Sequence, residues 1–385
     1  MRHCWLPLAA CLAWAGADPV FHARREALTK ALPNGVVVLH GQSESDADLR
    51  NGFYQDSNFY YLTGWKLPGA ALLIDPEREI LFLPAHNPER ERWTGPEPAM
   101  DDSNIQDVTG FQTVLPPEAL KGEWNASLER YRKVDGGDAE RAIARLRMKK
   151  SAHEIELMQR AADVSMAAHR AAWKRAGSLS TIEFTYLDRG CERSAYAPIV
   201  GSGPDSVFLH YSRNSRRMES GDALLVDAAA ECAGYAADIT RTIPVGGKFS
   251  ARQREIYEIV LGAQKAAIAA VKPGAYLGGL DRPSLQKVAM DYVNSHGRDL
   301  HGEPMGKYFT HGIGHHIGLD VHDASDNSVA LEEGMVISVE PGIYISEEDI
   351  GIRIEDMVVV TKDGARVMTA ALPREAAEIE KATRK

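Results

Sequence analysis

The sequence lacks the features that would place the protein in a membrane, in a zinc module or on nucleic acid. Beyond the apolar run from Cys4 to about Ala15, no stretch approaches the roughly 20 apolar residues that a membrane-spanning helix needs. Only four cysteines occur and none stands in a CxxC pair, so a zinc knuckle and a thioredoxin-like motif are absent. Positive charge is not in excess. The net charge of -10 and the pI near 5.8 argue against nucleic acid or an anionic membrane as the main partner.

An HExxH zinc-protease helix is also missing. His311 and His315 stand four residues apart, but no glutamate follows His311 and glycines interrupt the helix. No repeat of fixed period is visible. The composition, with 44% apolar and 25% charged residues, is that of an ordinary globular protein able to bury a sizeable core.

The N-terminus has the form of a secretory signal peptide. A basic start precedes the apolar run, and the triplet ending at Ala17 fits the small-x-small cleavage pattern. We therefore expect residues 1–17 to be removed and the mature protein to be exported to the periplasm or the exterior. Two alternatives stay open, a retained apolar helix and a lipid anchor at Cys11. In the mature chain, Cys191 and Cys232 either pair as a disulfide or remain buried thiols.

The length of 385 residues suits two domains. Residues 18–145 carry strand-like runs broken by Gly, Pro and Asp, which predicts a smaller α/β domain. Residues 146–385 begin with a long amphipathic helix that Ser151 can cap. Strand pairs joined by short hairpins and separated by helices then predict an α+β fold with antiparallel sheet. The predicted elements are strands at 36–40, 59–65, 70–75, 79–84, 223–231, 235–245, 335–345 and 351–361, and helices at 151–177, 250–271 and 282–296.

Two hairpins each carry a pair of carboxylates inside apolar strands. A bare buried carboxylate is costly unless it is paired or binds a metal ion. The turn residues 232–234 lie midway between Asp227 and Asp238. A hairpin centred there would place the two side chains opposite each other, with Cβ atoms about 5 Å apart.

The second hairpin repeats the arrangement with Glu340 and Glu355, whose midpoint falls at 347–348. The histidine-rich segment 311–323 can add one nitrogen ligand. Four carboxylates and one imidazole form an oxygen-rich set that prefers Mn²⁺, with Co²⁺, Fe²⁺ or Zn²⁺ as alternatives. Such a set suits two ions about 3.5–4 Å apart.

These segments resemble the pita-bread metallopeptidases, in particular the branch of aminopeptidase P and prolidase. The resemblance covers residues from about 146 to 370, and residues 53–65 also resemble the accessory domain of that branch. It implies a pita-bread catalytic domain preceded by a creatinase-N-like domain. The motifs that carry it are VDAAAECAGYAADITRTIPV, THGIGHHIGLDVHD, VISVEPGIYI, GIRIEDMVVVT and FYQDSNFYYLTGW.

The resemblance implies a set of metal ligands for two divalent ions. Asp238 and Glu355 match the positions that bridge both ions. The spacing after HGIG favours His315 over His316, and His316 stands where relatives often carry a large side chain. The five implied ligands are Asp227, Asp238, His315, Glu340 and Glu355.

Further residues match positions that act on the substrate. His210 matches a histidine near the reacting carbonyl, and His311 and His322 match two histidines that contact substrate. Arg353 matches an arginine that braces the metal carboxylates, and Glu340 is the expected proton carrier as well as a ligand. The remaining arginines and lysines are expected on the solvated surface.

The implied activity is the removal of the first residue from peptides whose second residue is proline. The main rival is an Xaa-Pro dipeptidase, because the two enzymes share every ligand. Methionine aminopeptidase is disfavoured by the additional N-terminal domain, and a metal-free creatinase-like hydrolase by the complete ligand set. A rival of another class is a catalytically inactive pita-bread binding module. Homo-oligomerisation is common in this family and stays open here.

Overall fold

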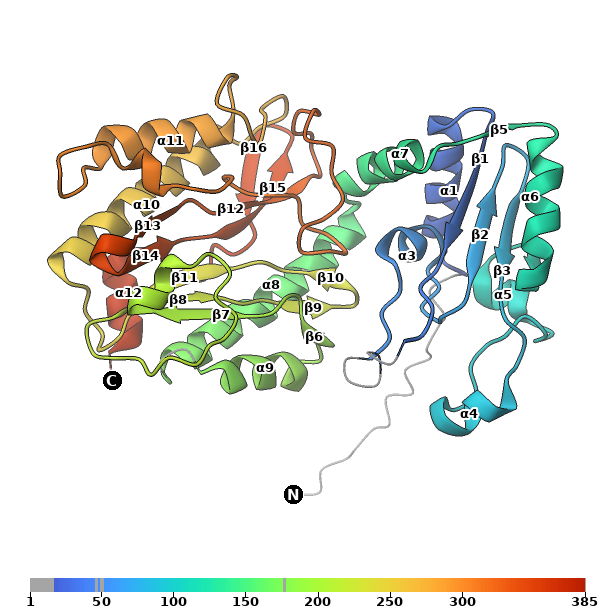
Figure 1. The fold of residues 1–385 in the computed structure, drawn as a ribbon, viewed down its shortest axis with the longest axis horizontal. Helices are drawn as coiled ribbons and strands as arrows, with labels where there is room; N and C mark the ends of the chain where they lie inside the picture. Colours follow the sequence, from blue (N-terminus) through green and yellow to red (C-terminus); the bar gives the residue numbers. More distant parts are fainter. Residues whose placement is uncertain (1–16, 46–47, 49–51, 176–177, 385) are drawn as a thin grey trace. The chain divides into compact units, whose positions relative to one another are not determined.

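The computed structural model describes residues 17–45, 48, 52–175 and 178–384 (Figure 1). The signal sequence predicted for residues 1–17 therefore lies outside the described residues except for Ala17, and Cys11 lies outside them entirely. The chain forms two compact units, the first ending at Leu146 and the second beginning at Arg147. No helix in the described part of the chain is long and apolar enough to cross a membrane.

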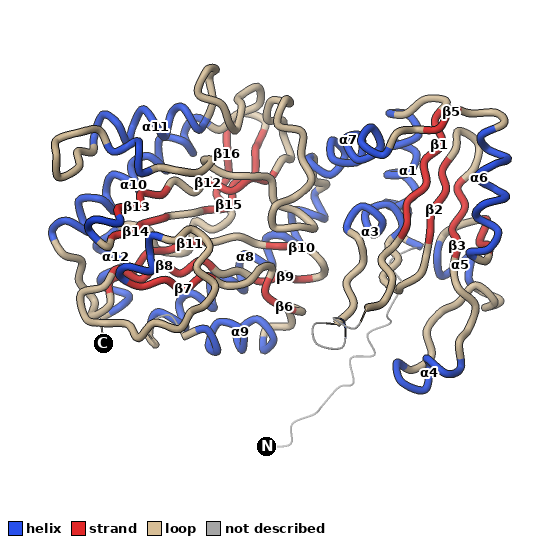
Figure 2. Tube along the Cα trace, in the orientation of Figure 1, coloured by secondary structure: helices blue, strands red, loops and turns tan. Residues whose placement is uncertain are grey.

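The N-terminal unit is built on one five-stranded sheet with the strand order β4-β3-β2-β1-β5 (Figure 2). The β1–β2 and β2–β3 pairs are antiparallel, and the β3–β4 and β1–β5 pairs are parallel. The strands are β1 (Gly35–His40), β2 (Ala71–Ile74), β3 (Glu79–Phe82), β4 (Thr113–Leu115) and β5 (Arg132–Lys133). The helices are α1 (Pro19–Ala31), α3 (Ser57–Thr63), α4 (Pro88–Thr94), α5 (Ile105–Thr109) and α6 (Leu120–Leu128). Helix α7 (Gly136–Met148) crosses the boundary, and its last two residues, Arg147 and Met148, belong to the second unit.

One predicted strand of this unit is wrong. The aromatic run at 59–65 was expected to be extended, but most of it forms helix α3. The side chain of Asp56 caps the helix by accepting a hydrogen bond from the N–H of Phe59, and Gly64 ends it in the left-handed conformation. The two capping residues thus outweigh the strand preference of aromatic side chains.

The C-terminal unit contains four small antiparallel sheets, within its described residues, flanked by long helices (Figure 1). The helices are α8 (Ala152–Trp173), α9 (Leu179–Asp188), α10 (Ala251–Ala270), α11 (Leu285–His296) and α12 (Ala376–Thr383). The first strands are β6 (Arg193–Ser194), β7 (Ile199–Ser202), β8 (Ala223–Asp227), β9 (Ala230–Cys232), β10 (Tyr235–Ala236) and β11 (Thr240–Pro244). The last strands are β12 (Val336–Val339), β13 (Gly342–Ile345), β14 (Ile350–Arg353), β15 (Asp356–Thr361) and β16 (Gly364–Val367). The antiparallel sheets and interspersed helices match the predicted α+β class.

Helix α8 begins with the expected cap. The hydroxyl of Ser151 accepts from the N–H of Glu154, and the carboxylate of Glu154 accepts from the N–H of Ser151. This cap fixes the position of the segment just before α8. The predicted stop at Gly177 lies outside the described residues.

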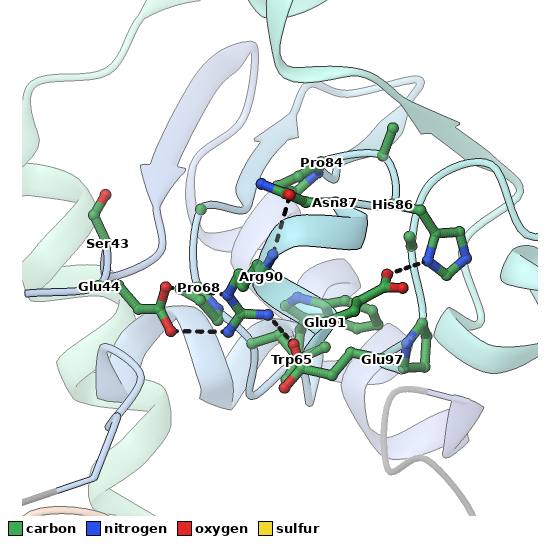
Figure 3. A pocket seen from close by; sticks show the side chains of 15 residues that line it. Ser43, Glu44, Trp65, Pro68, Pro84, His86, Asn87, Arg90, Glu91 and Glu97 are labelled. Carbon is green, nitrogen blue, oxygen red and sulfur yellow. Dashed lines mark hydrogen bonds and ion pairs between the residues drawn. The ribbon is translucent and has the colours of Figure 1, made fainter. Parts of the chain in front are cut away.

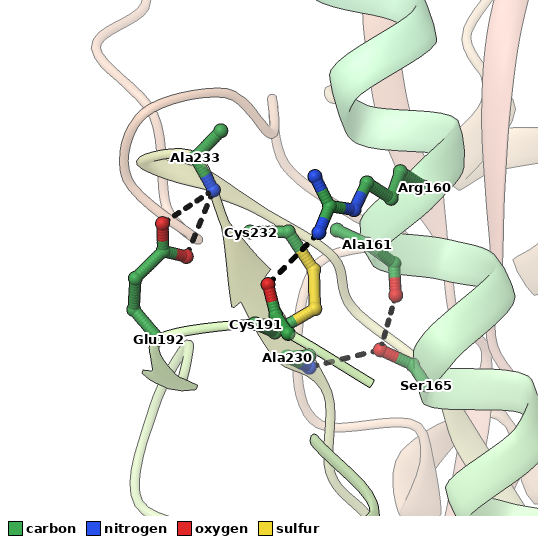
Figure 4. The surroundings of a disulfide bond; sticks show 9 residues. Arg160, Ala161, Ser165, Cys191, Glu192, Ala230, Cys232 and Ala233 are labelled. Carbon is green, nitrogen blue, oxygen red and sulfur yellow. Dashed lines mark hydrogen bonds between the residues drawn. A yellow bond between two sulfur atoms is a disulfide. The ribbon is translucent and has the colours of Figure 1, made fainter. Parts of the chain in front are cut away.

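Cys191 and Cys232 form a disulfide (Figure 4). The bond joins the segment after α9 to the end of β9, next to the turn of the first carboxylate hairpin. Within the turn, the N–H of Ala233 donates to both oxygens of Glu192, at 2.8 and 3.0 Å. The disulfide and this interaction together anchor the tip of the hairpin.

The expectation that the other basic residues lie on the surface is wrong for four of them. Each is buried because its charged group reaches a carboxylate inside the fold. The four residues are Arg25, Arg147, Lys150 and Arg241.

Candidate metal centre

The first carboxylate hairpin turns later than predicted. Ala233 and Gly234 form a tight turn with φ angles of 53° and 81°, and Cys232 pairs with Tyr235. The register therefore sets Asp227 opposite Thr240, not opposite Asp238. Asp238 stands two residues before Thr240 in the sequence. Because side chains two residues apart point to the same face, Asp227 and Asp238 still share one face as diagonal neighbours. The prediction of directly opposed aspartates is wrong because the turn is centred one residue further on.

The second hairpin has the predicted register. Val339 pairs with Asp356 on one side of a break, and Gly342 pairs with Arg353 on the other. Both pairs belong to the same antiparallel register, and this register sets Glu340 opposite Glu355 within the break.

Backbone and side-chain bonds join the two hairpins. The N–H of Glu355 donates to the carbonyl of Thr240 at 3.0 Å, and the hydroxyl of Thr240 donates to Glu355 Oε2 at 2.7 Å. The two hairpins therefore present their acidic side chains to one place.

His315 points at these carboxylates. Its Nε2 lies 3.3 Å from Asp238 Oδ2 and 3.3 Å from Glu340 Oε1. The adjacent His316 is buried, and its backbone forms a bridge with Ile337. The structure therefore directs His315, and not His316, into the acidic cluster. Ligand atoms of Asp238, His315 and Glu355 all lie within 4.8 Å of one another, which is a spacing that one ion could span.

The cluster carries more negative charge than its neighbours neutralise. Burial, together with the nearby carboxylates, raises the pKa of Glu355 well above its usual range. Burial is also the main cause that raises the pKa of Glu340 to about 7, against the opposing effects of His315 and Arg353. For His315, burial lowers the pKa, but the hydrogen bond to Asp238 and the surrounding acids outweigh it and raise the pKa to about 9.

A divalent cation fits this arrangement. Glu355 Oε1 is buried and has no hydrogen-bond partner among the described residues. A buried oxygen without a partner is costly, and a bound cation would satisfy it and offset the repulsion between the carboxylates. The oxygen-rich donor set with one imidazole is the type that hard or borderline divalent ions prefer.

Asp227 is held from two sides. The guanidinium of Arg353 donates to Asp227 Oδ2 at 2.5 Å, and the hydroxyl of Tyr196 donates to Asp227 Oδ1 at 2.5 Å. Arg353 also donates to the hydroxyl of Tyr344 at 2.9 Å. Burial, with the neighbouring Asp238, still raises the pKa of Asp227 despite these donors.

The two tyrosines were missed from the sequence. Tyr344 stands four residues after Glu340, and on an extended strand this places both side chains on one face, so alternation could have identified it. Tyr196 lies in an irregular segment between β6 and β7 and gives no such signal.

The predicted substrate histidines line the same cleft. His311 Nε2 lies 2.9 Å from the hydroxyl of Tyr344, and the rings of His315 and His322 have centroids 4.0 Å apart. Burial, with the charge of Arg353 as the next cause, lowers the pKa of His311 to about 4, so its ring is neutral near pH 7. The cleft has a volume of about 790 Å³ and is lined by all nine predicted site residues, Asp227, Asp238, His210, His311, His315, His322, Glu340, Arg353 and Glu355.

A smaller cavity of about 260 Å³ in the N-terminal unit differs in its charge balance (Figure 3). Arg90 lies between the carboxylates of Glu44 and Glu97, and His86 pairs with Glu91. Each of these three carboxylates is paired with Arg90 or His86. The cleft of the C-terminal unit differs in that it holds a buried carboxylate oxygen, Glu355 Oε1, without a partner among the described residues.

Comparison with known proteins agrees with this geometry. Residues 156–362 match the model of metallopeptidase family M24, and residues 21–134 match the aminopeptidase P N-terminal domain. The chain belongs to metallopeptidase family M24. The family is metal-dependent, and the fold predicted from the sequence is confirmed: an accessory N-terminal domain followed by a pita-bread catalytic domain.

Relatives of this M24 peptidase match over nearly the whole chain. It is 35% identical to the Xaa-Pro aminopeptidase of Haemophilus influenzae, over 93% of this chain and 95% of the relative. It is 33% identical to human Xaa-Pro aminopeptidase 3, over 86% of this chain and 77% of the relative. The solved structure of Escherichia coli aminopeptidase P with the inhibitor Pro-Leu superimposes with a TM-score of 0.82 at 27% identity, covering 94% of this chain and 97% of that one.

Proposed function

We propose that this M24 peptidase is an Xaa-Pro aminopeptidase, which hydrolyses the first peptide bond of peptides with proline at the second position. The observation that carries the proposal is the convergence of four carboxylates and His315 in one cleft of a chain whose relatives bear that name over nearly its full length. Proline calls for a dedicated enzyme because its amide has no N–H and its φ is fixed, so general proteases accommodate it poorly.

The proposed cofactor is a pair of divalent ions, with Mn²⁺ preferred and Co²⁺, Fe²⁺ or Zn²⁺ as alternatives. Bound ions of this kind lower the pKa of a water molecule toward neutrality and polarise the carbonyl that is attacked. The resemblance to the family implies that Asp238 and Glu355 would bridge the two ions, and ligand atoms of both residues lie within 4.8 Å of each other and of His315. The residues that would hold the ions are Asp227, Asp238, His315, Glu340 and Glu355.

The side chains around the proposed ions have distinct tasks. Glu340 would serve as the proton carrier as well as a metal ligand. His210, His311 and His322 line the cleft where the carbonyl and the proline ring would lie. Neutral His311 can exchange hydrogen bonds with substrate and with Tyr344. Arg353 fixes Asp227 and balances part of the charge.

The disulfide supports the proposal that the protein is exported. Stable disulfides are typical of oxidising compartments such as the periplasm, and Cys191–Cys232 is a buried pair. N-terminal sequencing of the protein from a periplasmic or culture fraction tests this. A mature start at Asp18 is expected, and a protein that retains residues 1–17 in the cytoplasm would contradict export.

Activity is tested with the mature chain after chelation and addition of Mn²⁺. Release of the first residue is followed from an Xaa-Pro dipeptide and from a longer Xaa-Pro peptide, with an Xaa-Ala peptide as the control. We expect metal-dependent cleavage of the Xaa-Pro substrates with preference for the longer one. Cleavage of the dipeptide alone would favour a dipeptidase. Bound metal without cleavage of any of the three would favour the inactive binding module.

A further inference from the structure

A buried group of charges lies behind the histidine segment of the cleft. Lys150 Nζ donates to Asp323 Oδ2 at 3.0 Å, and Arg147 donates to Asp323 Oδ1 and, at 2.8 Å, to Asp320. The side chains of Arg147, Lys150 and Asp323 are only 3%, 1% and 1% exposed. We call these three residues the Asp323 clamp.

The two cations of the clamp sit on a fixed part of the backbone. Arg147 belongs to the last turn of α7, and Lys150 directly precedes Ser151, the cap of α8. The N–H of Lys150 donates to the carbonyl of Gly334 at 3.0 Å. The cations are therefore positioned by elements that are independent of the loop that carries Asp323.

Asp323 closes that loop. Its N–H donates to the carbonyl of His316 at 2.9 Å, and its Oδ1 accepts from the N–H of Asp320 at 3.3 Å. Gly318 packs so closely that a Cβ there would lie 2.3 Å from Asp323 Oδ2, which explains the glycine. The segment from His316 to Asp323 thus returns on itself around one carboxylate.

The closed loop determines where His322 lies. His322 immediately precedes Asp323 in the sequence, and its ring lies against the ring of His315, with centroids 4.0 Å apart. His315 faces the acidic cluster, and His322 lies at the end of the closed loop. The position of His322 therefore depends on the loop remaining closed.

We propose that Lys150 and Arg147 act through Asp323 as positioning residues that set His322 in the substrate cleft. The inference rests on the proposed function, in which His322 contacts substrate. Removing either cation leaves a buried carboxylate with less compensating charge. The loop then opens to hydrate Asp323, and His322 moves with it. Displacements of about 1 Å from remote changes can reduce rates by roughly a hundredfold.

The test compares Lys150→Met with Lys149→Met in the Mn²⁺-loaded full chain. Lys149 is the matched control, because it is the preceding residue but its side chain is 61% exposed and lies 3.8 Å from Glu332. We expect Lys150→Met to lower kcat/KM for an Xaa-Pro peptide by about tenfold to a hundredfold. Metal content and the release rate of bound Mn²⁺ are expected to be unchanged. Lys149→Met is expected to match the wild type.

A double-mutant cycle separates positioning from a general effect on the fold. In a His322→Ala background, Lys150→Met is expected to cost less than about threefold, because its target is already absent. An equal loss in both backgrounds, or no loss in the wild-type background, would overturn the proposal. Lys150→Gln is tested in parallel, because it keeps an N–H donor for Asp323 and perturbs folding less; it is expected to show the same dependence on His322.

The same experiment reports separately on the proposed function. Failure of the wild type to cleave Xaa-Pro peptides would refute the function. A wild type that is active, with His322→Ala equally active, would refute the role of His322 and with it the inference about the clamp. Only an active wild type, an impaired His322→Ala variant and a non-additive cycle support the clamp.

Discussion

Glu355 and Asp356 are consecutive and both buried, at 1% and 0% exposure, yet their surroundings are opposite. Asp356 accepts from Arg241 at 2.6 Å and from Arg374 at 2.9 Å. It also accepts from the hydroxyl of Thr369 and the amide of Gln264. Its charge and its lone pairs are fully matched by the fold.

Glu355 faces the cleft with far fewer partners. It accepts from Thr240, its Oε1 has no partner in the described part of the chain, and other carboxylates surround it. The comparison teaches that burial alone does not identify a functional carboxylate. The charge of a structural carboxylate is compensated by the protein itself, whereas the charge of a carboxylate that binds metal is left for the cation to compensate.

The substitution Glu355→Gln tests this comparison with the largest expected effect. We expect kcat/KM for Xaa-Pro peptides to fall by roughly a thousandfold or more, because the metal loses a charged ligand. The free energy of unfolding of the chelated protein should not fall, since a buried, poorly compensated charge has been removed. Activity assays and denaturant unfolding in the presence of a chelator measure the two effects. A chelated variant much less stable than the wild type would show that Glu355 is structural.

Asp356→Asn should behave in the opposite way. Loss of this charge leaves Arg241 buried without its ion-pair partner, and breaking such a pair costs about 3–5 kcal/mol of unfolding free energy. The loss should be the same with and without Mn²⁺, and the folded fraction should still bind the metal. The comparison fails if the stability of Asp356→Asn depends on metal as strongly as that of the wild type.

The two carboxylate hairpins show which parts of the site could be predicted from the sequence. The second hairpin was placed correctly because its carboxylates are symmetric about the loop at 347–348. The first was placed two residues out of register, since the left-handed conformation of Ala233 is unusual for alanine and gave no signal of the turn centre.

The Asp323 clamp could not be predicted at all. Lysine and arginine are mostly exposed, and their burial here depends on a loop about 170 residues further along the chain. The strand patterns together with the family resemblance therefore predicted which residues face the cleft, while long-range contacts decided how they are supported.

A pH series sharpens the view that the cleft carboxylates lack compensation. The folded pKa of Glu340 is about 7, against 4.5 for an ordinary glutamate, so the chelated native state holds a proton that the unfolded chain releases. Stability from this group is present below pH 4.5 and is lost as the pH rises through 7. Relative to Glu340→Gln, the chelated wild type should lose up to about 3 kcal/mol between pH 4.5 and 7.5. Denaturant unfolding of both proteins across this range measures it. A constant difference between them would indicate that Glu340 is compensated like Asp356.

His315 and His316 repeat the same contrast with the smallest expected effect. The side chain of His316 is buried near Lys150 and Asp323, its Nδ1 has no hydrogen-bond partner among the described residues, and burial is the main cause that lowers its pKa to about 4. In His316→Phe, removal of this unsatisfied nitrogen offsets the cost of repacking, so stability should change by less than about 1 kcal/mol. Turnover should stay near that of the wild type, whereas His315→Phe should lose Mn²⁺ binding. Thermal unfolding, metal titration and peptide cleavage of the two variants compare neighbours that differ only in the face they occupy. Loss of Mn²⁺ in His316→Phe would mean that the adjacent imidazole, and not His315 alone, supports the metal.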